Sequence, residues 1–263
     1  MHDFRSSGLL KVPGFWILFI FLLFIVGRFI KPAFPASWEQ FVYGIGGTIG
    51  TFLLLWGFIK AEKGTFRNYE LFWQSGTLPR FFKGFLYGAI IFSCIMLVLV
   101  AAGGIRIRFS NSWDTSAAFW YLSIIPLALF EELAFRSYPF ILLKKKFSFL
   151  ITQLIVAVAF AVYHMIMGWD TTVAILGPGI WALVFGLGAA WSKGIALPTG
   201  IHVALNFSQQ VVGMKEDNGG NIFIMQELPS AAFIPANTVG MICQVAVGVL
   251  ALILTVIYRD RLK

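Results

Sequence analysis

Two adjacent glutamates, Glu131 and Glu132, lie in an apolar run that is long enough to cross a membrane. A carboxylate in hydrocarbon costs at least about 2.5–3.5 kcal/mol, so ionisable residues at such depth mark functional sites. His164, His202 and Asn206 lie in later apolar runs. A buried Glu and a nearby His can together deprotonate water, and a second His and an Asn amide can donate hydrogen bonds to an oxyanion. These parts are sufficient for amide hydrolysis without a covalent intermediate.

Helical spacing divides these residues between faces. Glu132 and Arg136 are four residues apart, share a face and are predicted to form an ion pair. Glu131 is rotated by about 100° and faces a different neighbour. His202 and Asn206 are also four residues apart and point into the same space.

The elements that carry these residues are predicted to be membrane-spanning helices. The chain has 263 residues, of which 59% are hydrophobic and 12% charged, whereas a soluble domain has roughly 25% charged residues. Helices are expected because lipid leaves every backbone group to be satisfied internally. Eight stretches are long enough to span a bilayer at about 1.5 Å per residue: 14–31, 39–59, 82–103, 117–143, 148–168, 172–192, 195–214 and 237–258. We therefore predict an all-α polytopic bundle of about eight transmembrane helices, forming one domain over 1–263 with a motif-bearing core at about 117–214.

The predicted helices place some of the polar residues at one depth. A hairpin turning near Lys146 holds Glu131 and His164 about sixteen residues from the turn on either side. His202 comes early in the seventh span and His164 late in the fifth, which runs parallel to it, so these two are expected to be offset. The offset would vanish if the seventh span started deep, with help from Gly194 and Pro198, or if its boundaries differed.

The distribution of basic residues predicts the orientation. The chain has 20 Lys and Arg against 12 Asp and Glu, a net charge of +8. Fourteen of the basic residues, including Lys144, Lys145 and Lys146, lie on the side of the N-terminus and five on the other side. The positive-inside rule then places both termini in the cytoplasm. The excess charge indicates topology and contact with anionic lipid, and no nucleic-acid partner is expected. We expect an integral protein of a bacterial plasma membrane.

Two polar connections are expected to leave the bilayer. The inner one, Lys60 to Pro79, is predicted to lie at the interface, and the outer one, Lys215 to Pro235, to form a flexible cap. Glycine faces on the second and sixth spans, including Gly47 and Gly186, are predicted to serve close helix packing.

Zinc is the competing use of buried Glu and His side chains. The HExxH pattern is absent, and two His and one Glu would have to converge on one point. No serine lies in a strand–turn–helix elbow. We therefore predict neither a metal nor another cofactor.

Three short motifs resemble those of the CPBP family of intramembrane endopeptidases, also called the CAAX protease and bacteriocin-processing (Abi) family. Residues 131–136 are similar to its EExxxR motif, residues 160–164 to FxxxH, and residues 202–206 to HxxxN. Each motif is weak alone, but the three occur in order and each lies in a predicted span.

The resemblance implies a glutamate-dependent intramembrane protease. Glu131 with His164 would activate water, His202 and Asn206 would form the oxyanion site, and Glu132 and Arg136 would be supporting residues. The partners would be the bilayer and a membrane-associated peptide or protein, with or without a lipid modification. Two alternatives remain at this point: a non-catalytic bacteriocin-immunity or scaffold protein, or a transporter that uses the buried Glu and His residues as a proton relay.

Overall fold

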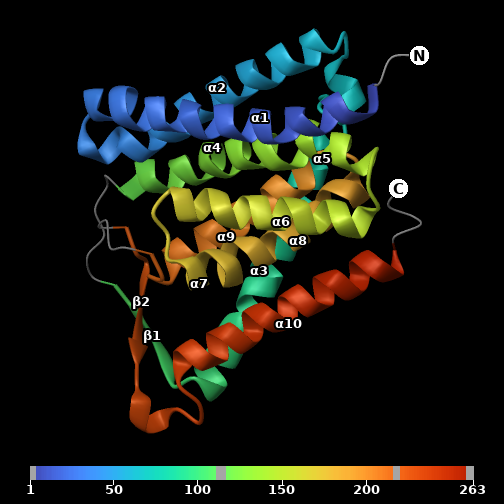
Figure 1. Ribbon diagram of the computed structural model, residues 1–263. Helices are drawn as coiled ribbons and strands as arrows, with labels where there is room; N and C mark the ends of the chain where they lie inside the picture. The colour runs from blue at the N-terminus through green and yellow to red at the C-terminus, as the bar shows by residue number, and fades with distance from the viewer. Residues whose placement is uncertain (1–3, 111–116, 216–219, 259–263) are drawn as a thin grey trace.

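The computed structural model describes residues 4–110, 117–215 and 220–258. Long helices lie alongside one another, and both ends of the chain lie at the same end of the bundle (Figure 1). The helices are α1 (Phe4–Ile25), α2 (Glu39–Ala61), α3 (Thr77–Ala102), α4 (Ala117–Arg136), α5 (Tyr138–Lys144), α6 (Phe149–Ile166), α7 (Thr171–Ala174), α8 (Ile180–Ser192), α9 (Ala196–Val211) and α10 (Ala236–Ile257). Two π-helical segments, Val26–Ile30 and Ile175–Gly179, extend α1 and join α7 to α8.

The predicted polytopic helical bundle is confirmed. Within the described residues, seven helices are long and apolar enough to cross a membrane. The eighth expected span corresponds to α9, which has 16 residues and is shorter than those seven.

The span predicted over 117–143 corresponds to one membrane-spanning stretch, Ala117–Lys144. Within this stretch the helix is interrupted at Ser137, where α4 ends and α5 begins. Ser137 has φ −110° and ψ −115°, which is not a helical conformation. Pro139 follows in the first turn of α5. A proline cannot donate to the preceding turn, and its ring clashes with that turn's carbonyl, so a helix ends before it and a new one begins.

A small antiparallel sheet was not predicted. Strand β1 (Ile105–Phe109) pairs with β2 (Phe223–Glu227), with Ile105 opposite Glu227. The outer connection predicted to be a flexible cap therefore contains a strand, while its residues 216–219 lie outside the described part of the chain. The alternation of apolar and charged residues in β1 is typical of a strand with two different faces.

Glycines on α3 and α9 allow these two helices to approach closely. A Cβ atom on Gly200 would lie 2.0 Å from the carbonyl oxygen of Phe81, and one on Gly84 would lie 2.1 Å from that of Leu197. Such contacts are possible only between backbones without side chains, as in other membrane helix pairs. They fix the position of α9 and hence of His202, which α9 carries.

The glycines on α2 and α8 also lie at close contacts. A Cβ atom on Gly47 would lie 2.7 Å from the ring of Phe130, and one on Gly186 would lie 1.8 Å from Oε1 of Gln153. Both positions serve close helix packing, as predicted. The contact at Gly47 seats α2 against α4, the helix that carries the glutamate pair.

Candidate active site

One cavity of about 560 Å³ brings together side chains from α2, α4, α6, α8 and α9. It is lined by all four residues that the sequence suggested for catalysis, which are Glu131, His164, His202 and Asn206. Glu132 and Arg136 do not line the cavity and are fully buried. The packing of the helices thus brings the three motifs together at one site.

Glu131 faces this cavity from α4. Its Oε1 atom accepts a hydrogen bond from the hydroxyl of Tyr163 at 3.3 Å, and its Oε2 atom lies 3.7 Å from Nε2 of His202. The side chain is 13% exposed, and Oε2 has no hydrogen-bond donor among the described residues. A buried carboxylate oxygen is normally satisfied by protein or water, so this atom is suited to hold a water molecule.

His164 is held in one tautomer by its own helix. Its Nδ1 atom lies 2.8 Å from the carbonyl oxygen of Phe160. A carbonyl oxygen can only accept, so Nδ1 carries the proton and the neutral ring keeps a lone pair on Nε2. Trp169 packs edge-on against the imidazole at 5.1 Å. The free Nε2 lone pair makes His164 a possible proton acceptor.

His202 is oriented by Glu132 and by an aromatic ring. Its Nδ1 atom lies 3.0 Å from Oε1 of Glu132, and its ring stacks on Phe185 at 4.6 Å. The carboxylate accepts a hydrogen bond from Nδ1–H, and Nε2 is a donor only when it carries a second proton. The carboxylate of Glu131 lies on the other side of the ring, with its Oε2 atom 3.7 Å from Nε2 of His202.

The predicted offset between His164 and His202 is wrong, since both side chains line one cavity. The start of the seventh span lies within one residue of the predicted one, because α9 begins at Ala196, whereas the helix ends at Val211 and not at 214. A sharp turn with positive φ at Lys193 and Gly194 leads into α9. His202 is the seventh of its 16 residues. It therefore lies near the middle of a short helix, where it reaches both glutamates.

The predicted Glu132–Arg136 ion pair is present. Nε of Arg136 lies 3.5 Å from Oε2 of Glu132, and both side chains are 0% exposed. The guanidinium carbon lies 4.4 Å from the ring centre of Phe160 and 5.1 Å from that of Phe185. Because Glu132 also binds His202, the pair is connected to the cavity. Sequence spacing assigned Glu132 to Arg136 alone and contained no signal for the second contact.

Arg136→Ala is expected to lower the yield of folded protein in detergent. Removing one partner of a buried pair leaves an uncompensated charge and costs roughly 3–5 kcal/mol. The double change Glu132→Gln/Arg136→Met should recover part of the yield but no activity, since His202 loses its carboxylate. Size-exclusion chromatography with an exposed control, Arg106→Ala, measures this. Normal folding of Arg136→Ala without activity would instead assign the pair to catalysis alone.

Two further cavity residues were missed from the sequence. Tyr163 binds Glu131, and Nζ of Lys215 donates to Oδ1 of Asn206 at 3.1 Å. Burial lowers the pKa of Lys215 to about 8, and the negative charge of Glu131 opposes this shift. Tyr163 precedes His164 in the second motif, which is a weak signal. Lys215 follows Asn206 by nine residues in a loop, and no spacing rule connects the two.

The described residues contain no group of three or more His, Cys, Asp or Glu side chains placed to hold a metal ion. The polar groups of the cavity are two imidazoles, one carboxylate, a lysine and several amides and hydroxyls. The fold and the site together define a polytopic membrane protein with a carboxylate–imidazole cluster enclosed by its helices.

Comparison with known families identifies the segment that carries this site. Residues 111–208 match the family model described as type II CAAX prenyl endopeptidase Rce1-like. The family resemblance predicted from the three motifs is thereby confirmed for this segment. Among curated proteins, none matches the chain.

Proposed function

We propose that this protein is an intramembrane endopeptidase that hydrolyses a peptide bond in a membrane-associated peptide or protein, with Glu131 as its essential carboxylate. The observation that carries the proposal is the shared cavity of Glu131, His164, His202 and Asn206. The match to a family of CAAX-type proteases supports the same reaction class.

The proposed reaction uses one water molecule and two sets of side chains. The water lies between Oε2 of Glu131 and Nε2 of His164, which remove a proton as its oxygen bonds to the scissile carbonyl carbon. The carbonyl oxygen becomes an oxyanion and accepts hydrogen bonds from Nε2–H of His202 and from the Asn206 amide. The C–N bond then breaks, and the proton is delivered to the leaving amine.

Two neighbours would orient the oxyanion donors. Glu132 holds Nδ1 of His202 and so fixes the direction in which Nε2 points. Lys215 donates to Oδ1 of Asn206, which leaves the Nδ2 hydrogens as the end of the amide available to substrate. Glu132 and Lys215 are therefore positioning residues in this proposal.

The proposal is tested by comparing protein termini in membranes that contain wild-type protein or Glu131→Ala at equal abundance. New termini present only with the wild type would identify cleaved substrates. Identical termini, together with an intact phenotype for the Glu131→Ala strain, would favour the immunity or scaffold class instead. Transport of protons or ligand by the wild type that Glu131→Gln abolishes, with no cleaved termini in either membrane, would favour a relay.

Lys215 predicts an alkaline limb in the pH profile of hydrolysis. Its pKa is lowered to about 8, so the ammonium group is present below this pH and is lost above it. The turnover number should fall as the pH rises through about 8, because the neutral amine donates a weaker hydrogen bond to Asn206 and carries no charge to offset that of Glu131. Lys215→Arg should move this limb to higher pH, and Lys215→Met should lower the rate at all pH values and remove the limb. An unchanged limb in both variants would exclude Lys215 as its source.

Metal is expected to be dispensable for hydrolysis. Chelators should leave activity unchanged, and purified protein should hold less than one equivalent of zinc by elemental analysis. The glutamate mechanism would be replaced by metal-activated water if stoichiometric zinc were lost in parallel with activity and restored it on addition.

We also propose that the protein lies in a plasma membrane with both termini in the cytoplasm. The excess of lysine and arginine at the terminus-bearing end of the bundle supports this orientation.

A further inference from the structure

The bundle has two distinct ends. The terminus end carries the start of α1, the end of α2, helix α5 and the end of α10 (Figure 1). The opposite end carries the α1–α2 connection, the α6–α7 connection, the end of α9 and the β1–β2 sheet (Figure 1).

The cavity that holds Glu131, here called the catalytic cavity, extends from the middle of the bundle to the opposite end. Gln40 at the start of α2, Trp169 in the α6–α7 connection, and Gln209 and Lys215 at and beyond the end of α9 all line it. Within the described part of the chain, no lining residue of this cavity belongs to the terminus end.

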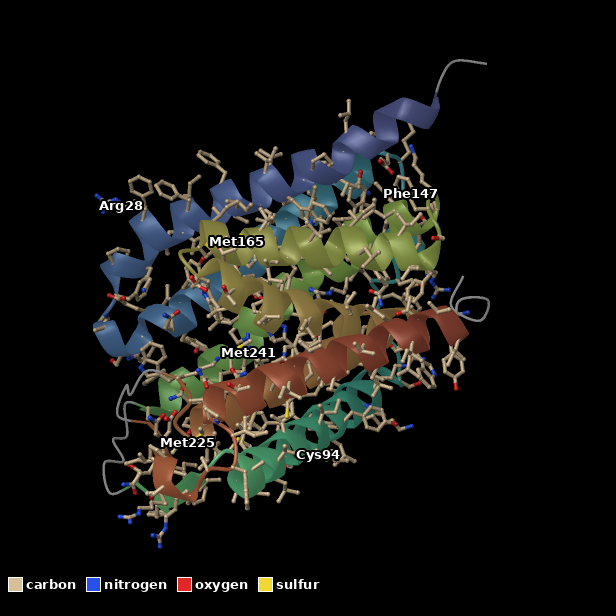
Figure 2. All side chains as sticks on the ribbon, turned by 60° about the horizontal axis from the view of Figure 1, so that its bottom comes forward. Arg28, Cys94, Phe147, Met165, Met225 and Met241 are labelled. Atoms are coloured by element: carbon tan, nitrogen blue, oxygen red, sulfur yellow. The ribbon has the colours of Figure 1, made fainter. Side chains whose placement is uncertain are left out.

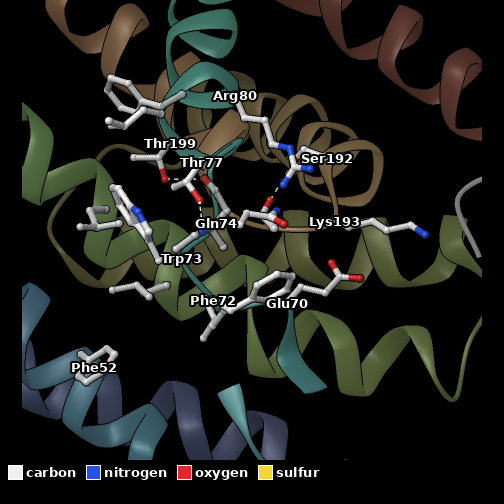
Figure 3. A pocket seen from close by; sticks show the side chains of 18 of the residues that line it. Phe52, Glu70, Phe72, Trp73, Gln74, Thr77, Arg80, Ser192, Lys193 and Thr199 are labelled. Atoms are coloured by element: carbon white, nitrogen blue, oxygen red, sulfur yellow. Dashed lines mark hydrogen bonds between the residues drawn. The ribbon is translucent and has the colours of Figure 1, made fainter. Parts of the chain in front are cut away.

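A separate cavity of about 530 Å³ lies at the terminus end. Figure 3 shows Glu70, Trp73, Arg80 and Lys193 around it. It has no lining residue in common with the catalytic cavity. Helix α4 separates the two cavities, because Leu129 and Leu133 face the terminus-end cavity while Leu127, Phe130 and Glu131 face the catalytic one. Glu131 is thus closed off from the terminus end by α4 itself.

The two ends of the bundle differ in the number of lysine and arginine residues that they carry. Arg28 and Phe147 lie at opposite ends (Figure 2), and Phe147 directly follows the Lys144–Lys146 run. The terminus end also carries Lys11, Lys60, Lys63, Arg67 and Lys193, whereas the opposite end has Arg28, Lys31, Arg106, Arg108 and Lys215. Because positive charge is retained on the cytoplasmic side, the opposite end faces away from the cytoplasm.

We infer that the catalytic cavity opens to the extracytoplasmic side, and that its substrate is a peptide segment already carried or inserted across the membrane, rather than a lipid-modified C-terminus in the cytoplasm. The statement about the substrate rests on the proposed function. The sidedness of the cavity stands on geometry and charge alone.

Single cysteines test the sidedness without any need for activity. In a background in which Cys94 and Cys243 are replaced by Ala, we compare Ala36→Cys at the opposite end, Ser75→Cys at the terminus end and Gln209→Cys at the cavity. Ala36 and Ser75 are exposed, uncharged and outside both cavities. Their substitution therefore leaves the charge balance that sets the topology unchanged.

A membrane-impermeant maleimide applied to intact cells should label Ala36→Cys and Gln209→Cys, while Ser75→Cys should react only after permeabilisation. Reaction of Gln209→Cys only together with Ser75→Cys, after permeabilisation, would overturn the inference.

Oriented vesicles then test the substrate side. The probe is a hydrophilic, internally quenched peptide that spans a cleavage site found by the comparison of termini. Right-side-out vesicles should cleave it, and inside-out vesicles should be at least about tenfold slower until detergent is added. Faster cleavage by inside-out vesicles would overturn the inference. If neither orientation nor detergent-solubilised protein cleaved the peptide, the proposed function would fail, while the labelling result would still decide the sidedness.

Discussion

Glu131→Gln should lower the turnover number for peptide hydrolysis by at least about 10²-fold, which is the low end for loss of a general base. The amide has nearly the shape of the carboxylate and can still accept the hydrogen bond from Tyr163. It cannot take a proton from water, so the chemical step is affected and the fold is not. The loss should appear in kcat and in kcat/KM together.

The matched control for this change is Glu39→Gln. Glu39 begins α2 and pairs with Lys31 at 3.2 Å on a partly exposed surface, and it does not line the cavity, although its neighbour Gln40 does. An exposed pair of this kind contributes little to stability, so this variant should retain wild-type activity. Purified Glu131→Gln with activity within threefold of wild type would rule out Glu131 as the general base.

Asn206→Ala should lower kcat by about 10²–10³ with little change in KM, because a single oxyanion donor is worth about 2.7–4 kcal/mol in the transition state. Asn206 lines the cavity one helical turn beyond His202, and Lys215 holds its carbonyl end. Its amide hydrogens are therefore the groups left for the substrate. His202→Ala should behave alike, and the double variant should lose less than the sum, since both donors serve one oxygen.

Ser208→Ala is the matched control on the same helix, since Ser208 does not line the catalytic cavity. This variant should keep both kcat and KM. If Asn206→Ala raised KM and left kcat unchanged, Asn206 would bind the substrate backbone, and the oxyanion role of α9 would have to be abandoned.

The spans and the buried ionisable residues within them were predictable from the sequence. Length and apolar composition are sufficient to recognise helices in lipid, because few other backbone structures satisfy their hydrogen bonds there. Ionisable residues stand out in such helices, which is why Glu131, His164 and His202 were found without a structure. The Glu132–Arg136 pair was also predictable, because a spacing of four residues specifies contact within a helix.

Contacts between helices were decided only by the tertiary structure. Runs that are apolar nearly all round carry no periodicity to show which face meets which neighbour, so the bond from Glu132 to His202, 70 residues apart, had no sequence signal. Its geometry depends on how closely α9 approaches α3, which Gly84 and Gly200 allow. The contact between Lys215 and Asn206 also depends on helix packing, because the helices that a loop joins determine where its residues lie.

Two features were predictable from the sequence only in part. They are the local break at Ser137 and the side on which the cavity opens. The break has a sequence signal in Pro139, but the apolar composition on both sides of it predicts one continuous span. Lysine and arginine counts predicted which end faces the cytoplasm, yet only the packing of α4 between the two cavities shows from which end Glu131 is reached. Composition therefore determined the helices and predicted their orientation in the membrane. Side-chain packing between helices determined which residues meet at the site, because hydropathy is a property of each segment and packing is a property of pairs.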